Sequence, residues 1–336
     1  MKILLATLPF HPSVGGVETV SRLLAEEWAR MGHAVVVATT TPSPEPAVAL
    51  GYRIERRPSL LQMVRLYCNA DLIILQGMTL RLGWPALLLP RRIFVVHHLV
   101  KDGTQHWTGL RRWLARRAGH VAVSRAVADS LPCRSHIISN PYSNAEFVNQ
   151  TPAVARERDL VFVGRLVGEK GADLAIAALL ALRARGLCPT LTIIGDGPEA
   201  ANLRDLIKEH ALHNQVMMLG SLTGGALVKE LNRHRIMLVP SRWKEPFGIV
   251  ALEGIASGCV VIGSNQGGLP DAIGDCGLLF PNNDTTALGD CIQRLLSEPE
   301  TCLQLRKQAA AHLQAHQASA IARRYLDIMK PLSGRA

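Results

Sequence analysis

Two glutamates separated by eight positions stand out in the stretch PSRWKEPFGIVALEGIASG, residues 240–258. An apolar run ends at Val239 and helical spacing of apolar residues begins near Gly248, so a helix should start between Glu245 and Glu253. Free N–H groups and the dipole at a helix N-terminus favour an anion. The backbone could therefore hold a phosphate there, with a carboxylate on each side for neighbouring hydroxyl groups. A capped helix with two surface acids is the plainer interpretation.

A second group of charged residues lies in LVFVGRLVGEKGADLAIAAL, residues 160–179. Arg165 and Lys170 follow an expected strand, and the glycines around them can keep this loop open. Two fixed cations at the carboxyl end of a strand could stabilise the charge that develops on a leaving diphosphate. The alternative is a solvated loop that ends in a helix-start glycine. The glycines concerned are Gly164, Gly168 and Gly171.

A glycine-containing turn, Gly195-Asp196-Gly197, separates a strand from a helix in LTIIGDGPE. Such a turn could border a nucleotide base. As a single short pattern it is a weak signal, and an ordinary turn explains it equally well.

The stretch VGGVE, residues 14–18, also joins an expected strand to an expected helix. Gly15 and Gly16 could let the backbone approach an anion. Glu18, however, adds negative charge to the first turn of the helix, and the pattern lacks the further glycines of a phosphate loop. A phosphate loop and a tight turn with a well-placed acid both remain possible at this point.

These loops belong to two series in which strands and helices alternate, which favours parallel strands joined by crossover helices. A polar, proline-containing stretch, residues 140–152, separates the two series and is typical of a linker. We therefore expect an α/β protein with two Rossmann-like domains, residues 1–150 and 151–316, and ligands at the carboxyl ends of the strands. The expected strands are 2–8, 34–39, 72–76, 93–97, 120–123, 135–139, 159–163, 191–194, 216–219, 236–239 and 260–263, and the expected helices include 172–185, 202–209, 226–232, 250–257 and 318–329.

The composition excludes several classes of protein. Of the 336 residues, 48% are hydrophobic, which favours burial over disorder, and the longest apolar runs are strand-sized, so no transmembrane segment is expected. The N-terminus lacks the features of a secretory signal. The seven cysteines are scattered without a C-x-x-C pair, which suits a reducing cytoplasm and argues against bridges or zinc.

The net charge of +10 is concentrated between residues 81 and 125. Within that region WTGLRRWLARRAGH, residues 107–120, interleaves apolar residues with four arginines, as expected of a basic amphipathic helix on an anionic membrane surface. A solvated helix whose tryptophans pack into the core is the alternative, and nucleic acid or an anionic substrate could also be attracted. Against a single acid, Asp102, the region holds nine basic residues: Arg81, Arg91, Arg92, Lys101, Arg111, Arg112, Arg116, Arg117 and Arg125.

Together the motifs resemble those of the retaining glycosyltransferases of family 4 over nearly the whole chain. The resemblance implies the GT-B architecture, in which two Rossmann-like domains with parallel sheets face an interdomain cleft. The C-terminal domain would grip a nucleotide-diphosphate sugar, the N-terminal domain would present the acceptor, and the terminal helix, within 317–336, would pack back onto the N-terminal domain. The matching motifs are GGVE, VVHH, AVSRAV, SNPY, FVGRLVGEKG, IIGDGPE, PSRWKEPFGIVALEGIASG and GGLPDAI.

The resemblance assigns roles to residues of the second domain. Arg165 and Lys170 would neutralise the donor diphosphate, so no metal ion or other cofactor is expected. Glu253 would bind the ribose hydroxyls, and Glu245 would contact hydroxyls of the donor sugar. The backbone of residues 247–250 would hold the distal phosphate and sugar. The other matching donor-site positions, with these backbone residues, are Gly164, Gly195, Asp196, Gly197, Phe247, Gly248, Ile249 and Val250.

The resemblance also implies roles in the first domain. His97 matches the family's histidine near the anomeric carbon, but His98 stands where the family more often has Asp or Gly, so which imidazole faces the site is open. Gly15 and Gly16 would approach the donor diphosphate from the opposite side. Asp271 departs from the family's usual Glu, which would shift a supporting contact only.

The function implied is transfer of a sugar from a nucleotide-diphosphate sugar to a hydroxyl of a glycan or lipid-linked acceptor, with retention of configuration. Synthesis of a cell-surface polysaccharide or lipopolysaccharide is the expected setting, in the cytoplasm or peripherally on the inner face of the cytoplasmic membrane. A sugar-nucleotide epimerase of the same architecture is the alternative within the fold. A nucleic-acid-binding protein would leave the donor-site residues unused, so nucleic acid is not an expected partner.

Overall fold

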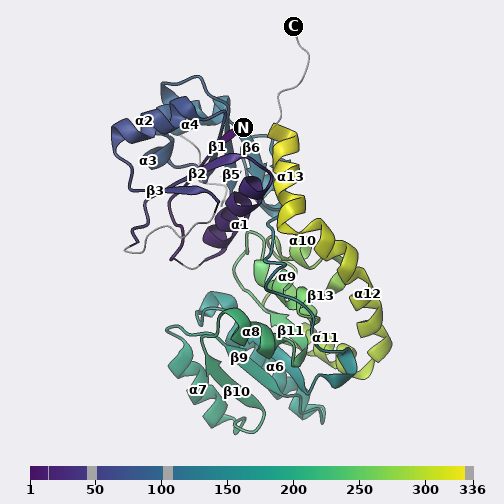
Figure 1. Ribbon diagram of the computed structural model, residues 1–336. Coiled ribbons are helices and arrows are strands. Elements are labelled where there is room, and N and C mark those ends of the chain that lie inside the picture. The colour runs from purple at the N-terminus through teal and green to yellow at the C-terminus, as the bar shows by residue number, and fades with distance from the viewer. Residues whose placement is uncertain (14, 44–50, 101–108, 330–336) are drawn as a thin grey trace. The chain divides into compact units, whose positions relative to one another are not determined.

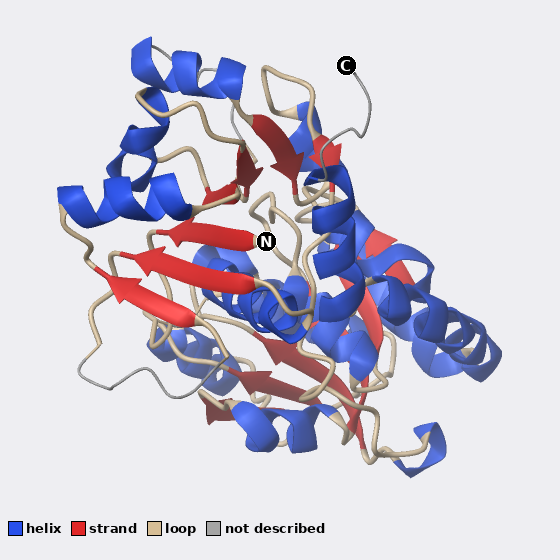
Figure 2. Ribbon diagram, turned by 45° about the horizontal axis from the view of Figure 1, so that its top comes forward, coloured by secondary structure: helices blue, strands red, loops and turns tan. Residues whose placement is uncertain are grey.

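The computed structural model describes residues 1–13, 15–43, 51–100 and 109–329, and it divides into two compact units. Unit 1 comprises Met1–Tyr142 together with His316–Ala336, and unit 2 comprises Ser143–Ala315. Each unit is built on one parallel sheet with helices packed on it, so the expected α/β class with two Rossmann-like units is confirmed. Figure 2 shows the strands of each sheet running side by side with helices over them.

Unit 1 holds a seven-stranded sheet in the order β3-β2-β1-β4-β5-β6-β7, with every neighbouring pair parallel. The order reverses direction at β1, as in doubly wound folds. The strands are β1 Lys2–Thr7, β2 Ala34–Thr39, β3 Arg53–Arg56, β4 Leu72–Gln76, β5 Ile93–His97, β6 Gly119–Ala122 and β7 His136–Ile137. The helices are α1 Gly16–Arg30, α2 Leu60–Asn69, α3 Leu80–Gly83, the 3-10 turn η1 Trp84–Leu87, α4 Gly109–Arg117, α5 Arg125–Asp129 and α13 Ala318–Met329.

The last helix, α13, completes unit 1 (Figure 1). It packs against α1, where the indole Nε1 of the fully buried Trp28 donates a hydrogen bond to the carbonyl oxygen of Ala322 at 3.1 Å. The Trp28 ring also meets the Tyr325 ring edge-on, with centroids 6.0 Å apart. The core of unit 1 is therefore made by both ends of the chain. Residues 330–336, which the expected terminal segment included, lie outside the described residues.

Unit 2 holds a six-stranded parallel sheet in the order β10-β9-β8-β11-β12-β13. Its core is a continuous apolar cluster of strand and helix side chains that includes Phe162, Leu179 and Leu238. The strands are β8 Arg158–Val163, β9 Leu191–Ile194, β10 Val216–Gly220, β11 His234–Val239, β12 Val260–Ser264 and β13 Gly277–Phe280. The helices are α6 Ala172–Ala184, α7 Ala200–Glu209, α8 Gly224–Leu231, α9 Ile249–Ala256, α10 Leu269–Ile273, α11 Thr285–Ser297 and α12 Pro299–Ala315, with 3-10 turns η2 Ala153–Ala155, η3 Gly168–Lys170 and η4 Gly274–Cys276.

The alternation of strands predicted most of both sheets but missed the edge strands β3 and β13. β3 reads RIER, in which charged residues outnumber the apolar one, because an edge strand is only partly covered. β13 is a four-residue strand that begins at Gly277, where an added Cβ would lie 2.1 Å from the carbonyl oxygen of Val261. The glycine thus lets this strand approach its neighbour closely.

The division between the units lies after Tyr142 and not after residue 150, where the linker composition suggested it. The intervening residues pack onto unit 2. Phe147 is buried, the backbone N–H of Gln150 donates to Asn232 Oδ1 at 2.6 Å, and Arg156 donates to Asn149 Oδ1 at 2.8 Å. The chain returns to unit 1 after Ala315, one residue before the expected end of the second domain.

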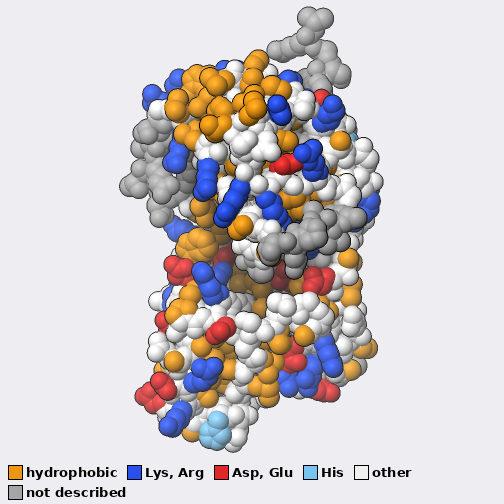
Figure 3. All heavy atoms as spheres, turned by 60° about the vertical axis from the view of Figure 1, so that its left-hand side comes forward, with side chains coloured by type: hydrophobic (Ala, Val, Ile, Leu, Met, Phe, Trp, Pro, Cys, Tyr) orange, Lys and Arg blue, Asp and Glu red, His pale blue; other side chains and the backbone are white. Residues whose placement is uncertain are grey.

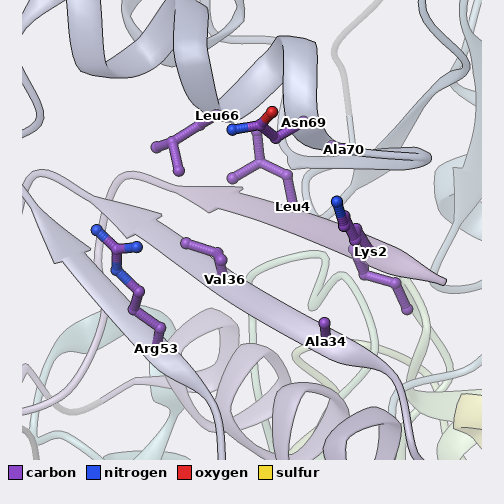
Figure 4. Close-up of a pocket in the computed structure, with 9 residues that line it drawn as sticks. Lys2, Leu4, Ala34, Val36, Arg53, Leu66, Asn69 and Ala70 are labelled. Carbon is purple, nitrogen blue, oxygen red and sulfur yellow. The ribbon is translucent and has the colours of Figure 1, made fainter.

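One cavity of about 310 Å³ lies in unit 1 between the sheet and α2 (Figure 4). Its lining includes Lys2, Ala34 and Arg53, which are the first residues of β1, β2 and β3. It therefore lies toward the amino ends of these strands, whereas ligands of doubly wound sheets bind at the carboxyl ends. In the described segments, no helix combines the length and the apolar character that crossing a membrane requires.

Candidate active site

The carboxyl edge of the unit 2 sheet brings two predicted loops together, those after β8 and β9. The Gly164 N–H donates to the carbonyl oxygen of Ile194 at 3.0 Å, and the Leu166 N–H donates to that of Asp196 at 2.9 Å. Gly195 has a φ of +146°, and a Cβ there would lie 1.9 Å from the Gly164 carbonyl oxygen. Only glycine fits this position, so the Gly195-Asp196-Gly197 turn is built against the loop that carries Arg165.

The loop after β11 joins the same assembly. The carbonyl oxygen of Glu169 accepts hydrogen bonds from the backbone N–H groups of Arg242 at 2.8 Å and Trp243 at 3.2 Å. A Cβ on Gly171 would lie 2.1 Å from the Pro240 carbonyl oxygen, and the φ of Gly171 is +72°. The segment that carries Lys170 is therefore fixed against the segment that leads to Glu245.

Lys170 and Glu245 form an ion pair at this junction. Glu245 is buried, and its Oε1 also accepts a hydrogen bond from the Ser241 hydroxyl at 2.8 Å. The Lys170 ammonium lies 5.9 Å from the centre of the Trp243 ring. A lysine ammonium carries three hydrogens. Lys170 can therefore stay paired with Glu245 and still donate to an anion.

Arg165 is exposed, and within the described residues its guanidinium makes no hydrogen bond or ion pair. It projects from the loop that Gly164 and Leu166 hold against the β9 turn. A guanidinium without a protein partner at such a position is available to bind an anion. Arg165 and Lys170 thus lie in one loop after β8, and Lys170 contacts Glu245.

The loop after β11, which carries Glu245, leads directly into the N-terminus of α9. Gly248 caps the helix with a φ of +99°, and no side chain accepts a hydrogen bond from the first turn. Phe247 is buried and anchors the approach to the helix, while Gly248, Ile249 and Val250 are half-buried. The first N–H groups of α9 remain uncapped by side chains, so this helix end suits an anion.

Glu253 lies on α9, one turn beyond its N-terminus, and is half-buried. Burial, with a smaller contribution from the carboxylate of Glu146, raises its pKa to about 7. A carboxyl group with a pKa near neutrality in a site is a candidate for ligand contact. Sequence reasoning missed Glu146, because it lies in the presumed linker, more than a hundred positions from Glu253.

The Gly267-Gly268 turn after β12 supports the backbone of Glu245. The Gly268 N–H donates to the Glu245 carbonyl oxygen at 2.6 Å, and a Cβ on Gly267 would lie 2.3 Å from that oxygen. Asp271, the departure from the family pattern, follows in the first turn of α10. Sequence reasoning used these glycines for register only, although paired glycines after a strand signal a close backbone approach.

Arg242 is a further residue that sequence reasoning missed. Its guanidinium donates to both oxygens of Asp173, at 2.7 and 2.6 Å, to the Gly168 carbonyl oxygen at 2.9 Å, and to Asn283 Oδ1 at 2.9 Å. Burial opposes ionisation of Asp173, but the hydrogen bonds from Arg242 outweigh it and lower the pKa of Asp173. Arg242 therefore braces three loops, including those of Lys170 and Glu245.

Unit 1 carries two adjacent histidines at the end of β5, in different surroundings. His97 is buried, and its Nε2 lies 3.0 Å from His120 Nδ1, while His120 Nε2 lies 2.8 Å from the Ala115 carbonyl oxygen. A carbonyl only accepts, so His120 Nε2 carries a hydrogen. In the neutral ring His120 Nδ1 then accepts from His97, which is thereby held beneath α4.

His98 is half-buried and lies beside Gln76, the last residue of β4, with Nε2 2.5 Å from the amide oxygen. Burial lowers the pKa of His98 to about 4, so the ring is neutral near pH 7. Because the amide oxygen only accepts, Nε2 carries the hydrogen and Nδ1 keeps a lone pair. The two imidazoles at the carboxyl ends of β4 and β5 thus differ in their surroundings: His97 is buried against His120, and His98 is half-buried and donates to Gln76.

The N-terminus of α1 holds its own acid. Gly15 is the N-cap and α1 begins at Gly16, while Val14 lies outside the described residues. A Cβ on Gly15 would lie 2.5 Å from a carboxylate oxygen of Glu18, and the Ser13 hydroxyl donates to Glu18 at 3.3 Å. The Glu18 carboxylate thus folds back over the turn. The structure therefore shows a tight turn in which the Glu18 carboxylate supplies the negative charge at the N-terminus of α1.

Metal-ligating residues do not gather elsewhere: no group of three or more His, Cys, Asp or Glu side chains suited to a metal ion occurs among the described residues. The seven cysteines are all free thiols.

Comparison with known families identifies both halves of the chain. The family model described as Glycosyl transferases group 1 matches residues 143–312, and the one described as Glycosyltransferase Family 4 matches residues 14–141. A glycogen synthase of Mycobacterium tuberculosis is 37% identical over 154 residues, which are 45% of this chain and 37% of that protein. The chain thus spans little more than a third of the length of this relative.

A second relative matches over most of both chains. A GDP-mannose-dependent alpha-(1-6)-phosphatidylinositol monomannoside mannosyltransferase of M. tuberculosis is 26% identical over 353 aligned positions, covering 88% of this chain and 89% of that protein. Among solved structures, Anabaena HepE in complex with UDP superposes with a TM-score of 0.80 at 19% identity, covering 98% and 99% of the two chains. At this level of sequence identity, the similarity to HepE shows a shared fold only.

Proposed function

The chain belongs to the group 1 glycosyl transferases, and on that basis we propose that it transfers a sugar from a nucleotide-diphosphate sugar to a hydroxyl group of a glycan or lipid-linked acceptor. One observation carries the proposal. At the carboxyl edge of the unit 2 sheet, Arg165, the Lys170–Glu245 ion pair and the uncapped N-terminus of α9 come from loops that contact one another.

This arrangement suits the departure of a diphosphate. As the bond between the sugar and the distal phosphate breaks, negative charge grows on the phosphate oxygens. Arg165, Lys170 and the first N–H groups of α9 would stabilise that charge, which makes a divalent metal ion unnecessary. Glu245 would orient the donor sugar through its hydroxyls, and Glu253 would accept hydrogen bonds from the ribose. The Gly195-Asp196-Gly197 turn would border the base.

The stereochemical course we propose is retention, as the resemblance to family 4 implies. The acceptor hydroxyl would attack on the face from which the diphosphate leaves, and the departing phosphate oxygen would take its proton. The Glu245 carboxylate is paired with Lys170 and Ser241, which favours a role in binding over one as a covalent nucleophile. In unit 1 we assign the contact with the transferred sugar to His98, in preference to His97, because His98 is half-buried whereas His97 is buried against His120.

Our proposals for the nucleotide base of the donor and for the cellular setting are based on similar proteins. HepE was solved with UDP and with UDP-glucose, and the mycobacterial mannosyltransferase depends on GDP-mannose, so UDP- and GDP-sugars are the first donors to test. We place the enzyme in cell-surface polysaccharide or lipopolysaccharide synthesis, at the inner face of the cytoplasmic membrane. The free cysteines suit that reducing compartment.

The test is a transfer assay on Lys170→Ala with Lys208→Ala as the matched control. Lys208 is exposed on α7, away from the loops of the site. We expect Lys170→Ala to lose about a hundredfold or more in kcat while the protein stays folded, with a lower thermal midpoint because buried Glu245 loses its ion-pair partner. Full activity of Lys170→Ala would remove the assignment. Release of nucleoside diphosphate only with acceptor present indicates transfer, whereas a donor epimerised without acceptor would indicate an isomerase.

A further inference from the structure

The helices at one end of unit 1 form a single layer. α2, α3, η1 and α4 bury their inner faces in one apolar cluster, which includes Met63, Tyr67, Ala86 and Leu114. The Tyr67 hydroxyl donates to the Leu82 carbonyl oxygen at 2.8 Å and so ties α2 to α3. The outer faces of these elements therefore form one continuous surface, called here the helical end.

The helical end exposes large apolar side chains. Leu60 and Leu61 in the first turn of α2 are 71% and 60% exposed, and Leu88 after η1 is 74% exposed. On α4, Leu110 and Trp113 are 58% and 38% exposed and lie three positions apart, so they share one helix face. Figure 3 shows hydrophobic side chains gathered at this end of the unit. Trp113 thus does not pack into the core, while Trp107 lies outside the described residues.

The same surface is basic throughout. Arginine side chains border the apolar patch (Figure 3), and the described stretches 57–70, 77–100 and 109–128 contain no Asp or Glu. The Arg117 guanidinium lies 4.5 Å from the centre of the Trp113 ring, and Arg91 donates to the Cys68 carbonyl oxygen at 2.6 Å. The exposed arginines are Arg57, Arg65, Arg81, Arg91, Arg92, Arg111, Arg112, Arg116 and Arg117.

An exposed apolar patch with a polar rim marks an interaction site. The chemistry of this one fits a lipid bilayer. Aliphatic side chains can enter the boundary between head groups and acyl chains, a tryptophan is suited to that boundary, and arginines bind phosphate and anionic head groups. A nucleic acid would use the arginines but would leave the exposed leucines in water.

We propose that the helical end docks unit 1 on an anionic membrane, with Leu60, Leu61, Leu88, Leu110 and Trp113 inserted and the arginines on the lipid phosphates. The surface extends beyond the basic region 81–125 to α2, whose leucines supply part of the insertion. α2 and α4 each carry both exposed apolar side chains and exposed arginines, so both helices contribute to insertion and to electrostatic attraction. The proposal concerns vesicle binding and does not depend on the sugar-transfer reaction.

Flotation of the full chain with vesicles tests the proposal. Vesicles of phosphatidylcholine with phosphatidylglycerol should bind the protein, and vesicles of phosphatidylcholine alone should bind it at least about tenfold less tightly. The double variant Leu60→Ser/Leu61→Ser should weaken binding about tenfold or more at every salt concentration, since each inserted leucine removes apolar surface from water. Arg111→Gln/Arg112→Gln should weaken it mainly at low salt.

The matched control is Leu279→Ser/Leu303→Ser, which changes two leucines of unit 2 that are 41% and 45% exposed. It should bind vesicles as the unaltered protein does, and all variants should keep their thermal midpoints. No binding to anionic vesicles, or unchanged binding by Leu60→Ser/Leu61→Ser, would overturn the proposal. So would equal binding to neutral vesicles, or tight binding of duplex DNA that the leucine substitutions weaken. Sugar transfer is measured separately, so either proposal can fail alone.

Discussion

The carboxyl edges of the two sheets differ in how tightly their loops are locked. In unit 2, Gly195 lies against Gly164 and Gly171 against Pro240, so close that a single added carbon would collide with backbone. In unit 1, Gly77 at the end of β4 has a φ of +99°, but no atom of the described residues would lie within 4 Å of an added Cβ. Beside it, the amide nitrogen of Gln76 is buried without a hydrogen-bond partner among the described residues.

This difference matches the division of labour that we propose. A diphosphate is the same in every nucleotide sugar, so a site for it gains from a fixed geometry that loses little conformational entropy on binding. In the described part of the unit 1 edge, a Cβ on Gly77 would meet no such contact, and the Gln76 amide nitrogen has no described partner. In our proposal this edge adjusts to the acceptor and to the transferred sugar.

The largest expected effect comes from comparing two matched variants, Gly195→Ala at the edge of the unit 2 sheet and Gly77→Ala at the edge of the unit 1 sheet. Both alanines must adopt a positive φ, but only the one at 195 also meets a carbonyl oxygen at 1.9 Å. We expect Gly195→Ala to lower the free energy of unfolding by about 3 kcal/mol or more and to abolish donor binding, and Gly77→Ala to cost about 1 kcal/mol. Urea unfolding and donor titration measure both. Equal costs would show that the two edges are equally locked.

Substitution of His97 or His98 in unit 1 should have a smaller effect than the glycine substitution at position 195. His98→Ala should lower kcat about a hundredfold, because it removes a hydrogen-bonding group at the edge, and it should cost less stability than His97→Ala, because the imidazole removed is only half-buried. His97→Ala should instead cost about 1–3 kcal/mol of stability, since it removes a buried side chain and its hydrogen bond to His120 Nδ1. Transfer kinetics and thermal unfolding of the two variants separate the roles. The reverse pattern would return the catalytic contact to His97.

The smallest expected effect is a pH dependence from Glu253. Its pKa of about 7 means that the Glu253 carboxyl group is mostly protonated at pH 6 and mostly ionised at pH 8, and in our proposal the ionised form accepts the hydrogen bonds of the ribose. Donor affinity should therefore rise by roughly tenfold over that range. Since the pKa is raised on folding, the contribution of Glu253 to stability is full below its unfolded pKa and is lost as pH rises through about 7.

Glu253→Gln is the control for this prediction, because an amide does not titrate. Its donor affinity should be independent of pH between 6 and 8. If the unaltered protein showed a flat profile as well, Glu253 would not be the group that meets the ribose.

The parts of the site that sequence alone predicted are those where a charge follows a strand directly. Arg165, Lys170 and Glu245 lie in loops whose ends are set by β8 and β11, so strand assignment was enough to bring them together. The Arg242–Asp173 brace could not be predicted in this way. It depends on which direction each side chain takes after the loops have packed.

The histidines show a related limit. Adjacent residues at a strand end point to opposite faces, and both faces of a parallel sheet are covered by helices, so the sequence HH does not say which imidazole is the more buried. The choice is made by α4, whose Ala115 carbonyl fixes His120 and through it His97. Likewise the fold was predicted wherever strands are buried, and the edge strands β3 and β13 were missed because their sequences are short or charged.

The return of the chain to unit 1 has a consequence for how the protein is made. Trp28 in α1 and Tyr325 in α13 bury one another, and a backbone bridge joins Tyr142 to Gln317 where the chain leaves the unit and comes back. At about 5–20 residues per second, α13 emerges from the ribosome roughly 10–40 seconds after β7. Throughout that interval α1 must keep an open apolar face, so on the ribosome the unit that starts first is finished last.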